Sequence, residues 1–134
     1  METTTLSVRT GDEECVCDLT AAARRFVTGR GSGLLSVFVP HATAGLAILE
    51  LGSGSDADLL AALAGLLPVD YKWYHAHGSN GHGRSHVLPA LIAPSLTVPV
   101  LDGHLLLGTW QSIALVDLNV DNPERTVRLS FLSG

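Results

Sequence analysis

The sequence is poor in residues that mark several common classes of protein. Lysine and arginine total only 8 of 134 residues and form no run, so nucleic acid is not the expected partner. No apolar stretch approaches the roughly 18 residues needed to span a bilayer. The amino terminus also lacks the basic start and apolar centre of a secretory signal. We therefore expect a cytoplasmic protein that binds neither nucleic acid nor membrane.

Cysteine is also scarce, since the only two, Cys15 and Cys17, lie in one short segment with strand character. Side chains at i and i+2 of a strand share a face, so the pair could oxidise or contribute to a soft-metal site. Neighbours on one strand rarely have good disulfide geometry, and cytosolic thiols are usually reduced. The pair is therefore interpreted as two buried structural thiols.

Several familiar catalytic motifs are absent. The sequence has no P-loop, no dinucleotide-binding glycine fingerprint, no nucleophile elbow and no H-E-x-x-H motif. The enzymatic classes that the residues still support are metal-assisted chemistry and acid–base catalysis by histidine.

The apolar residues predict a folded domain of the α+β class. They make up 46% of a chain whose net charge is −5, which argues for a real core. Apolar periodicity and capping residues predict two helices, over residues 21–28 and 55–68. Short turns between the later strands favour antiparallel sheets packed with these helices, in a single domain over residues 1–134. The predicted strands are 6–8, 15–19, 34–40, 45–51, 96–100, 104–107, 109–118 and 126–132.

Histidine is concentrated in one stretch, YHAHGSNGHGRSH. It holds four of the six histidines within twelve residues: His75, His77, His82 and His86. The intervening glycines, with Ser79 and Asn80, predict a loop rather than a helix or strand. Imidazole is the commonest metal ligand in proteins and carries protons near neutral pH. A solvated loop or an adventitious metal-binding tract is the alternative reading.

Longer motifs resemble the YjbQ-like family. They are PHATAGLAILE at 40–50, the segment from Tyr74 to Asp117 that includes LTVPV and GTWQ, and the region of Arg125. Some members of that family are described as secondary thiamine-phosphate synthases. The chain departs from the family pattern at Leu51 and at 118–122. His77, His82 and His104 have no secure counterpart. The matching positions are His41, Glu50, Asp58, His75, His86, Gln111 and Arg125.

The resemblance implies a small α+β domain that assembles as a homotrimer, with a histidine-lined metal site near a subunit boundary. A catalytic divalent metal needs three convergent ligands with room for water. His75 and His86 bracket ten loop residues and could meet. We take His41, which follows a buried strand, as the third ligand. Zinc is the expected metal.

Three further residues are predicted to act on the substrate. Glu50 would be a general base or orient an imidazole, unless it is simply an exposed strand end. Gln111 would orient a substrate or satisfy a backbone group in the core. Arg125, with Arg128, would hold an anionic group or else lie on a solvated face. Asp58 is more typical of a helix cap than of a catalytic group.

The sequence thus predicts a small cytoplasmic metal-binding enzyme acting on an anionic or phosphorylated metabolite. The family resemblance implies a transferase that forms thiamine phosphate. Two alternatives stay open at this point: a metal-dependent hydrolase or phosphatase, and a non-catalytic trimeric protein that binds metal structurally. A closed shell of four protein ligands favours structure, and three ligands with an open position favour catalysis.

Overall fold

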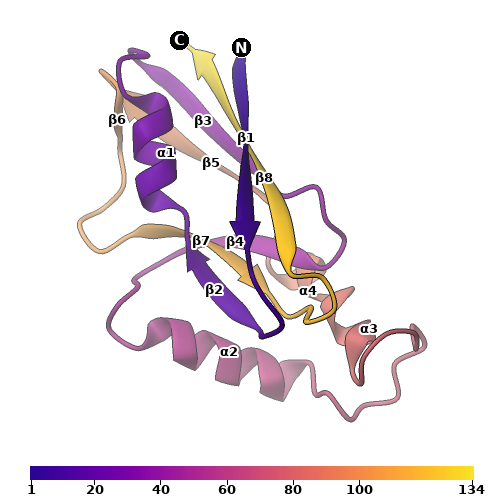
Figure 1. The fold of residues 1–134 in the computed structure, drawn as a ribbon. Coiled ribbons are helices and arrows are strands. Elements are labelled where there is room, and N and C mark those ends of the chain that lie inside the picture. Colours follow the sequence, from indigo (N-terminus) through magenta and orange to yellow (C-terminus); the bar gives the residue numbers. More distant parts are fainter.

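The computed structural model describes residues 1–134 and contains eight strands, two longer helices and two single-turn helices (Figure 1). The helices are α1 (Thr20–Val27), α2 (Ser55–Leu66), α3 (His82–Ser85) and α4 (Leu88–Leu91). The strands are β1 (Glu2–Arg9), β2 (Cys15–Asp18), β3 (Gly33–Phe38), β4 (Ala44–Leu49), β5 (Ser95–Leu101), β6 (His104–Leu105), β7 (Ser112–Asp117) and β8 (Glu124–Ser133). None of the helices is long and apolar enough to cross a membrane.

The strands form two antiparallel sheets. The larger has the order β1-β8-β3-β5-β6, and the smaller has the order β2-β7-β4. In β3, Leu35 and Val37 are fully buried, whereas Leu34 and Phe38 are exposed. This alternation follows from the period of two along a strand, and it turns one face of the larger sheet toward the core.

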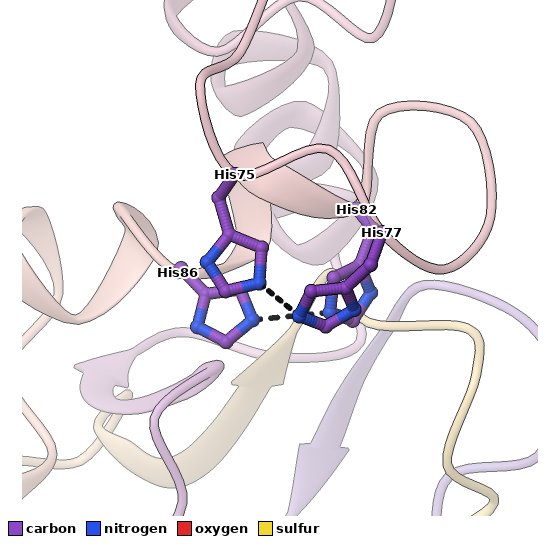
Figure 2. A group of neighbouring side chains, drawn as sticks. All are labelled: His75, His77, His82 and His86. Carbon is purple, nitrogen blue, oxygen red and sulfur yellow. Dashed lines mark hydrogen bonds between the residues drawn. The ribbon is translucent and has the colours of Figure 1, made fainter.

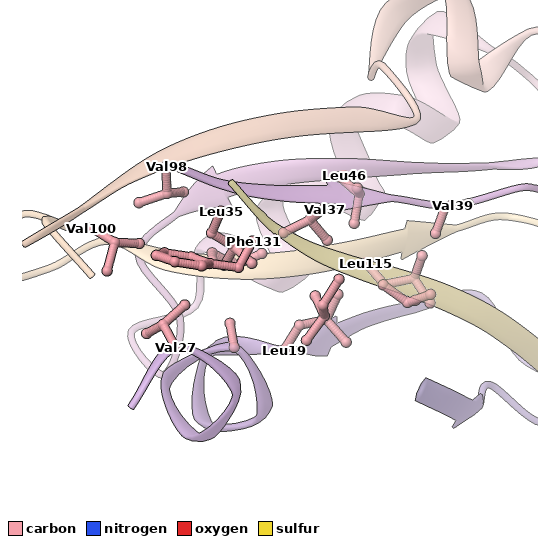
Figure 3. Packing of buried hydrophobic residues seen from close by; sticks show 14 of the residues in the cluster. Leu19, Val27, Leu35, Val37, Val39, Leu46, Val98, Val100, Leu115 and Phe131 are labelled. Carbon is pink, nitrogen blue, oxygen red and sulfur yellow. The ribbon is translucent and has the colours of Figure 1, made fainter. Parts of the chain in front are cut away.

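The main core lies where the inner faces of both sheets and helix α1 meet (Figure 3). The larger sheet contributes residues such as Leu35 and Phe131, the smaller sheet contributes Ile113 and Leu115, and α1 contributes Val27. Apolar burial of this kind supplies the largest favourable free energy of folding.

A second, smaller core lies on the opposite face of the three-stranded sheet. Here Leu63 and Leu67, at the end of α2, pack with Leu88 of α4 and with Val116 of β7. The strand β7 is therefore buried on both faces. This second core holds the chain on either side of the histidine stretch, because α2 precedes that stretch and α4 follows it.

The α+β class and the antiparallel pairing predicted from the sequence are confirmed. Helix α4 was not predicted, and the stretch expected to be an irregular loop contains helix α3. The predicted capping box of α2 does not form: the helix begins after Gly54 without a side-chain cap, and Asp58 is exposed. Strand β7 starts at Ser112, three residues later than predicted.

Candidate metal centre

The four clustered histidines converge on one point (Figure 2). One ring nitrogen from each of His75, His77, His82 and His86 lies within 4.8 Å of those of the other three. The Nε2 atoms of His82 and His86 are 3.0 Å apart, and those of His75 and His77 are also in contact. The rings of His75 and His86 stack with centroids 3.8 Å apart. His82 and His77 are therefore part of this group, although the family resemblance did not include them.

Local backbone geometry explains how the two halves of the histidine stretch meet. Helix α3 begins after Gly81, which has a φ of 76°. At Gly83, inside α3, a Cβ atom would collide with the carbonyl oxygen of His75 and with the Trp73 side chain. The missing side chain thus allows the segment that carries His75 to lie directly against the helix that carries His86.

Buried polar contacts fix α3 to the body of the protein. The Arg84 side chain is 4% exposed; its Nη1 donates to the Leu67 carbonyl at 2.9 Å, and its Nη2 pairs with the carboxylate of Glu14. Ser85, fully buried, donates from Oγ to the carbonyl of His82 at 2.6 Å. The short helix is thus held from two distant parts of the chain, and the positions of His82 and His86 follow from it.

Asp121 orients one ring of the cluster. Its Oδ2 lies 2.7 Å from Nδ1 of His82, and it accepts hydrogen bonds from the backbone N–H and the hydroxyl of Ser79, both at 3.1 Å. The Ser79 backbone N–H is the main cause of a lowered pKa for Asp121. Nδ1 of His82 lies against this carboxylate in a charge contact without good hydrogen-bond geometry, and Nε2 of the same ring faces Nε2 of His86 at 3.0 Å.

Two rings of the cluster, His75 and His86, have lowered pKa values, which favours the neutral form that a metal ion binds. Burial lowers the pKa of His86, and the neighbouring rings of His75, His82 and His77 lower it further. The pKa of His75 is lowered by desolvation, and also by His77 and His82. Neutral imidazole is the form that binds metal ions, and each ring offers one free lone pair.

A polar cavity of about 450 Å³ adjoins the cluster. His77, His82 and His86 form one side of it, and the other side comes from the segment just before β4, the β7–β8 connection and the start of β8. Only one of its twelve lining residues is hydrophobic, so the cavity suits a polar molecule. The remaining lining residues are His41, Ala42, Thr43, Gly78, Asn119, Asp121, Asn122, Glu124 and Arg125.

His41 lies on this cavity but outside the four-histidine group. Its Nε2 accepts a hydrogen bond from the backbone N–H of Thr126 at 2.9 Å. The expected grouping of His41 with His75 and His86 is therefore not the arrangement in the structure, because its Nε2 lone pair is used by the main chain. The same bond requires the proton to be on Nδ1, so His41 is neutral and offers a single N–H donor.

Arg125 lies at the cavity but is neutralised by a buried partner. Its Nε is 2.5 Å from Oδ2 of Asp117 in a charge contact without good hydrogen-bond geometry, and its Nη2 donates to Oδ1 at 3.4 Å. Its Nη1 donates to the carbonyl oxygens of Asn122 and Glu124. Burial raises the pKa of Asp117, and Arg125 partly offsets that effect. Arg125 therefore braces the β7–β8 connection and adds no net charge to the cavity.

Glu50 and Gln111 lie away from the cavity. Glu50 follows β4 and accepts a hydrogen bond from the Ser53 hydroxyl at 3.0 Å. Gln111 is not on a strand. Its side-chain Oε1 accepts a hydrogen bond from the backbone N–H of Gly108 at 2.8 Å, and its backbone N–H donates to the Gly108 carbonyl. These contacts close a tight turn before β7, so neither side chain is placed to act on a molecule in the cavity.

Comparison with known proteins shows the family. The profile described as "UPF0047 protein YjbQ-like" matches residues 4–134. The chain belongs to the YjbQ-like family. It is 60% identical to the UPF0047 protein Rv2556c of Mycobacterium tuberculosis over the full length of both chains. It is 31% identical to the UPF0047 protein YugU of Bacillus subtilis, covering 81% of this chain and 83% of YugU.

Solved structures of YjbQ-like proteins share this fold. The hypothetical protein APE1520 of Aeropyrum pernix matches all of both chains with a TM-score of 0.88 and 34% identity. A YjbQ-like protein of unknown function from Sulfolobus solfataricus superposes with a TM-score of 0.91, covering 99% of this chain and 97% of the other, at 24% identity. The family resemblance predicted from the sequence motifs is confirmed.

We expect His41 to make folding stability depend on pH. Partial burial, with a smaller contribution from Arg125, lowers its pKa from the ordinary value of 6.5, while Asp117 acts in the opposite direction. Neutral His41 therefore contributes stability that is complete above about pH 6.5 and is lost as the pH falls through the folded-state pKa. H41Q keeps an acceptor for the Thr126 N–H but does not titrate.

The free energy of unfolding, measured by urea denaturation between about pH 7 and pH 5, should fall less steeply for H41Q than for the wild type. H104Q is the control, because His104 is exposed and its ring contacts only the Asp102 carbonyl. Equal slopes for H41Q and the wild type would contradict the assignment.

Proposed function

We propose that this protein binds one divalent transition-metal ion at the four-histidine cluster and uses it to hydrolyse a small phosphorylated metabolite held in the adjoining cavity. The observation that carries the proposal is the convergence of four imidazole nitrogens within 4.8 Å on the wall of a polar cavity. Zinc is the ion that this donor set fits best among the abundant metals, because zinc accepts neutral imidazole in tetrahedral geometry.

The spacing of the nitrogens supports the fit. Metal–nitrogen bonds of 2.0–2.1 Å in a tetrahedron place ligand nitrogens roughly 3.4 Å apart. The Nε2 atoms of His82 and His86 are 3.0 Å apart, and the largest separation in the group is 4.8 Å. Small rotations of His75 and His77, which are exposed, would bring all four nitrogens to that spacing.

The surroundings favour a catalytic role over a structural one. Four protein ligands would form a closed shell, which by itself favours a structural ion, but three of these rings line the cavity and His75 and His77 are exposed. An ion would also connect only residues 75–86 with one another, and Arg84 already holds this segment to the rest of the chain. A structural ion would therefore add little to the stability of the fold. Displacement of one exposed ring would open a coordination position for a substrate.

Charge supports an anionic substrate. Four neutral imidazoles bring no negative charge to a divalent cation, so only the carboxylates of Asp121 and Glu124 at the cavity would offset it, and such an ion would supply Lewis-acid polarisation of a phosphoryl oxygen. The Nδ1–H of His41 would donate a hydrogen bond to a bound molecule. Glu124 lines the cavity, and its side chain forms no hydrogen bond or ion pair within the chain, so it is the carboxylate placed to accept a proton.

The finer expectations from the family resemblance stay predictions. Formation of thiamine phosphate is one reaction to assay beside phosphate hydrolysis. Self-association as a trimer agrees with apolar side chains exposed on the outer face of the larger sheet, where Leu34 of β3 is paired in register with Leu132 of β8. Exposed neighbouring apolar residues of this kind are typical of contact surfaces.

Hydrolysis of a panel of phosphorylated metabolites tests the proposal. Zinc-loaded wild type should release phosphate, and H86A should fall to the level of metal-free protein, because the cluster then loses a ligand. H104A is the matched control, since His104 is exposed and outside the cluster. Full activity of H86A, or of metal-free wild type, would refute the proposal.

The same variants distinguish catalysis from a structural role. If the ion is catalytic, H86A should keep the oligomeric state of zinc-loaded wild type. If the ion is structural, H86A should show a lower melting temperature and a weaker oligomer than zinc-loaded wild type, with no catalytic activity in either protein.

Gly83 gives a second test that leaves every ligand in place. G83A should push the His75 segment away from α3, since the new methyl group meets the His75 carbonyl, and zinc affinity should fall by about tenfold to a hundredfold. The control is G65A, where the added Cβ has no neighbour within 4 Å, and its affinity should be unchanged. Isothermal titration with zinc measures both variants. An unchanged affinity in G83A would contradict the assigned packing.

A further inference from the structure

The proposed metal centre does not use the two cysteines, which occupy a distinctive position. Cys15 and Cys17 lie on one face of β2, an edge strand of the smaller sheet, with their Sγ atoms 2.9 Å apart. Both are half-buried rather than fully buried as the sequence predicted, and Cys17 packs against the main core. Their sulfur atoms are in contact with each other.

The surroundings of the two sulfur atoms favour a bond between them over a shared metal ion. The observed Sγ–Sγ distance of 2.9 Å lies between the roughly 2.05 Å of a disulfide and the roughly 3.8 Å of two thiolates on a tetrahedral zinc ion, so the choice depends on further ligands. The only group of three or more candidate ligand side chains in the chain is the histidine cluster.

The two thiols are chemically unequal. The hydrogen bond between the two thiols lowers the pKa of Cys17 and raises the pKa of Cys15. The thiolate is the nucleophile in thiol–disulfide exchange, so Cys17 is the residue that attacks first. Cys15, held against it, is placed to resolve the product.

We propose that Cys15 and Cys17 form a reversible dithiol–disulfide couple that reacts with small-molecule disulfides and weakens the metal centre when oxidised. The Cys17 thiolate attacks one sulfur of the reagent, forming a mixed disulfide and releasing one thiolate. The Cys15 thiol then loses its proton to solvent, and its sulfur attacks Sγ of Cys17, which breaks the mixed disulfide and releases the second thiolate. Both released thiolates take up protons from solvent. The protein loses two electrons and two protons, and the reagent is reduced to two thiols.

Closing the disulfide would shorten β2. Residues i and i+2 of a strand are about 6.7 Å apart at Cα, whereas the preferred Cα separation across a disulfide is about 5.5–6 Å. The strand can yield, because it is four residues long and pairs only with β7. A disulfide closed under such strain is readily reduced again, which is typical of regulatory rather than structural bridges.

The shortening would be transmitted through Glu14, the neighbour of Cys15. Glu14 pairs with Arg84, which lies in α3 between His82 and His86. Withdrawal of Glu14 removes one of the two contacts that hold the buried guanidinium. Because α3 begins at His82 and is capped at its C-terminal end by His86, oxidation should lower metal affinity. This effect rests on the proposed metal site, whereas disulfide formation does not.

Equilibration with reduced and oxidised glutathione, followed by thiol alkylation and mass spectrometry, tests the couple. Wild type should lose both alkylation sites together within one chain. C15S should accumulate a stable mixed disulfide at position 17, and C17S should react much more slowly. Failure to form the bridge under fully oxidising conditions, or formation of disulfides only between chains, would overturn the proposal.

Zinc titration of the same samples tests the link to the histidines. Oxidised wild type should bind zinc about tenfold more weakly than reduced wild type. The C15S/C17S double variant should bind like reduced wild type whether or not it is treated. Equal affinities for oxidised and reduced wild type would overturn the link. Absence of zinc binding in reduced wild type would instead refute the metal site. Mass spectrometry would still show whether the disulfide forms.

Discussion

The arrangement of the candidate site depends on one buried charge, Arg84. Four imidazole rings meet with no opposite charge at their centre, and nothing in their own contacts would hold such a group together in water. Arg84 lies between two of these rings in the sequence and is fixed from outside by Glu14 and by the end of α2. A buried guanidinium is strongly disfavoured without partners, so these contacts leave α3 a single position.

The layers of the fold explain why these partners are in place. The two sheets enclose the main core, and α2 and α4 cover the far face of the smaller sheet. The histidine stretch is the connection between these helices, and both of its ends are packed. On the opposite side of the cavity, Asp117 and Arg125 brace the β7–β8 connection, which carries Asp121 to within 2.7 Å of His82. Two separately anchored segments therefore form the site.

Much of the fold could be predicted from the sequence, because alternation in strands such as Leu34–Phe38 and the apolar face of 59–67 are local patterns. The family resemblance followed from GTWQ and the histidine-containing motifs. The histidine stretch was partly misjudged, since its glycines suggested a loop. Gly83 is helical because the close approach of His75 requires a residue without a side chain. The four-residue spacing of His82 and His86, typical of one helix face, was the signal available.

Sequence patterns could not show the roles of four residues, because their contacts are with distant or main-chain groups. These residues are His41, Glu50, Gln111 and Arg125. The N–H of Thr126 that engages His41 is 85 positions away in the sequence. Gln111 looked like a strand residue because GTWQSIALVD continues into β7, but its amide closes a turn with Gly108. Arg125 pairs with the buried carboxylate of Asp117 and does not lie in open solvent. A polar side chain is a candidate for a site only after its main-chain partners are known.

X-ray absorption at the zinc edge of protein loaded with one equivalent of zinc measures the central claim most directly. The account predicts a first shell dominated by nitrogen at about 2.0–2.1 Å, with the outer-shell scattering of three or four imidazole rings. A first shell of oxygen or sulfur ligands without imidazole scattering would contradict it.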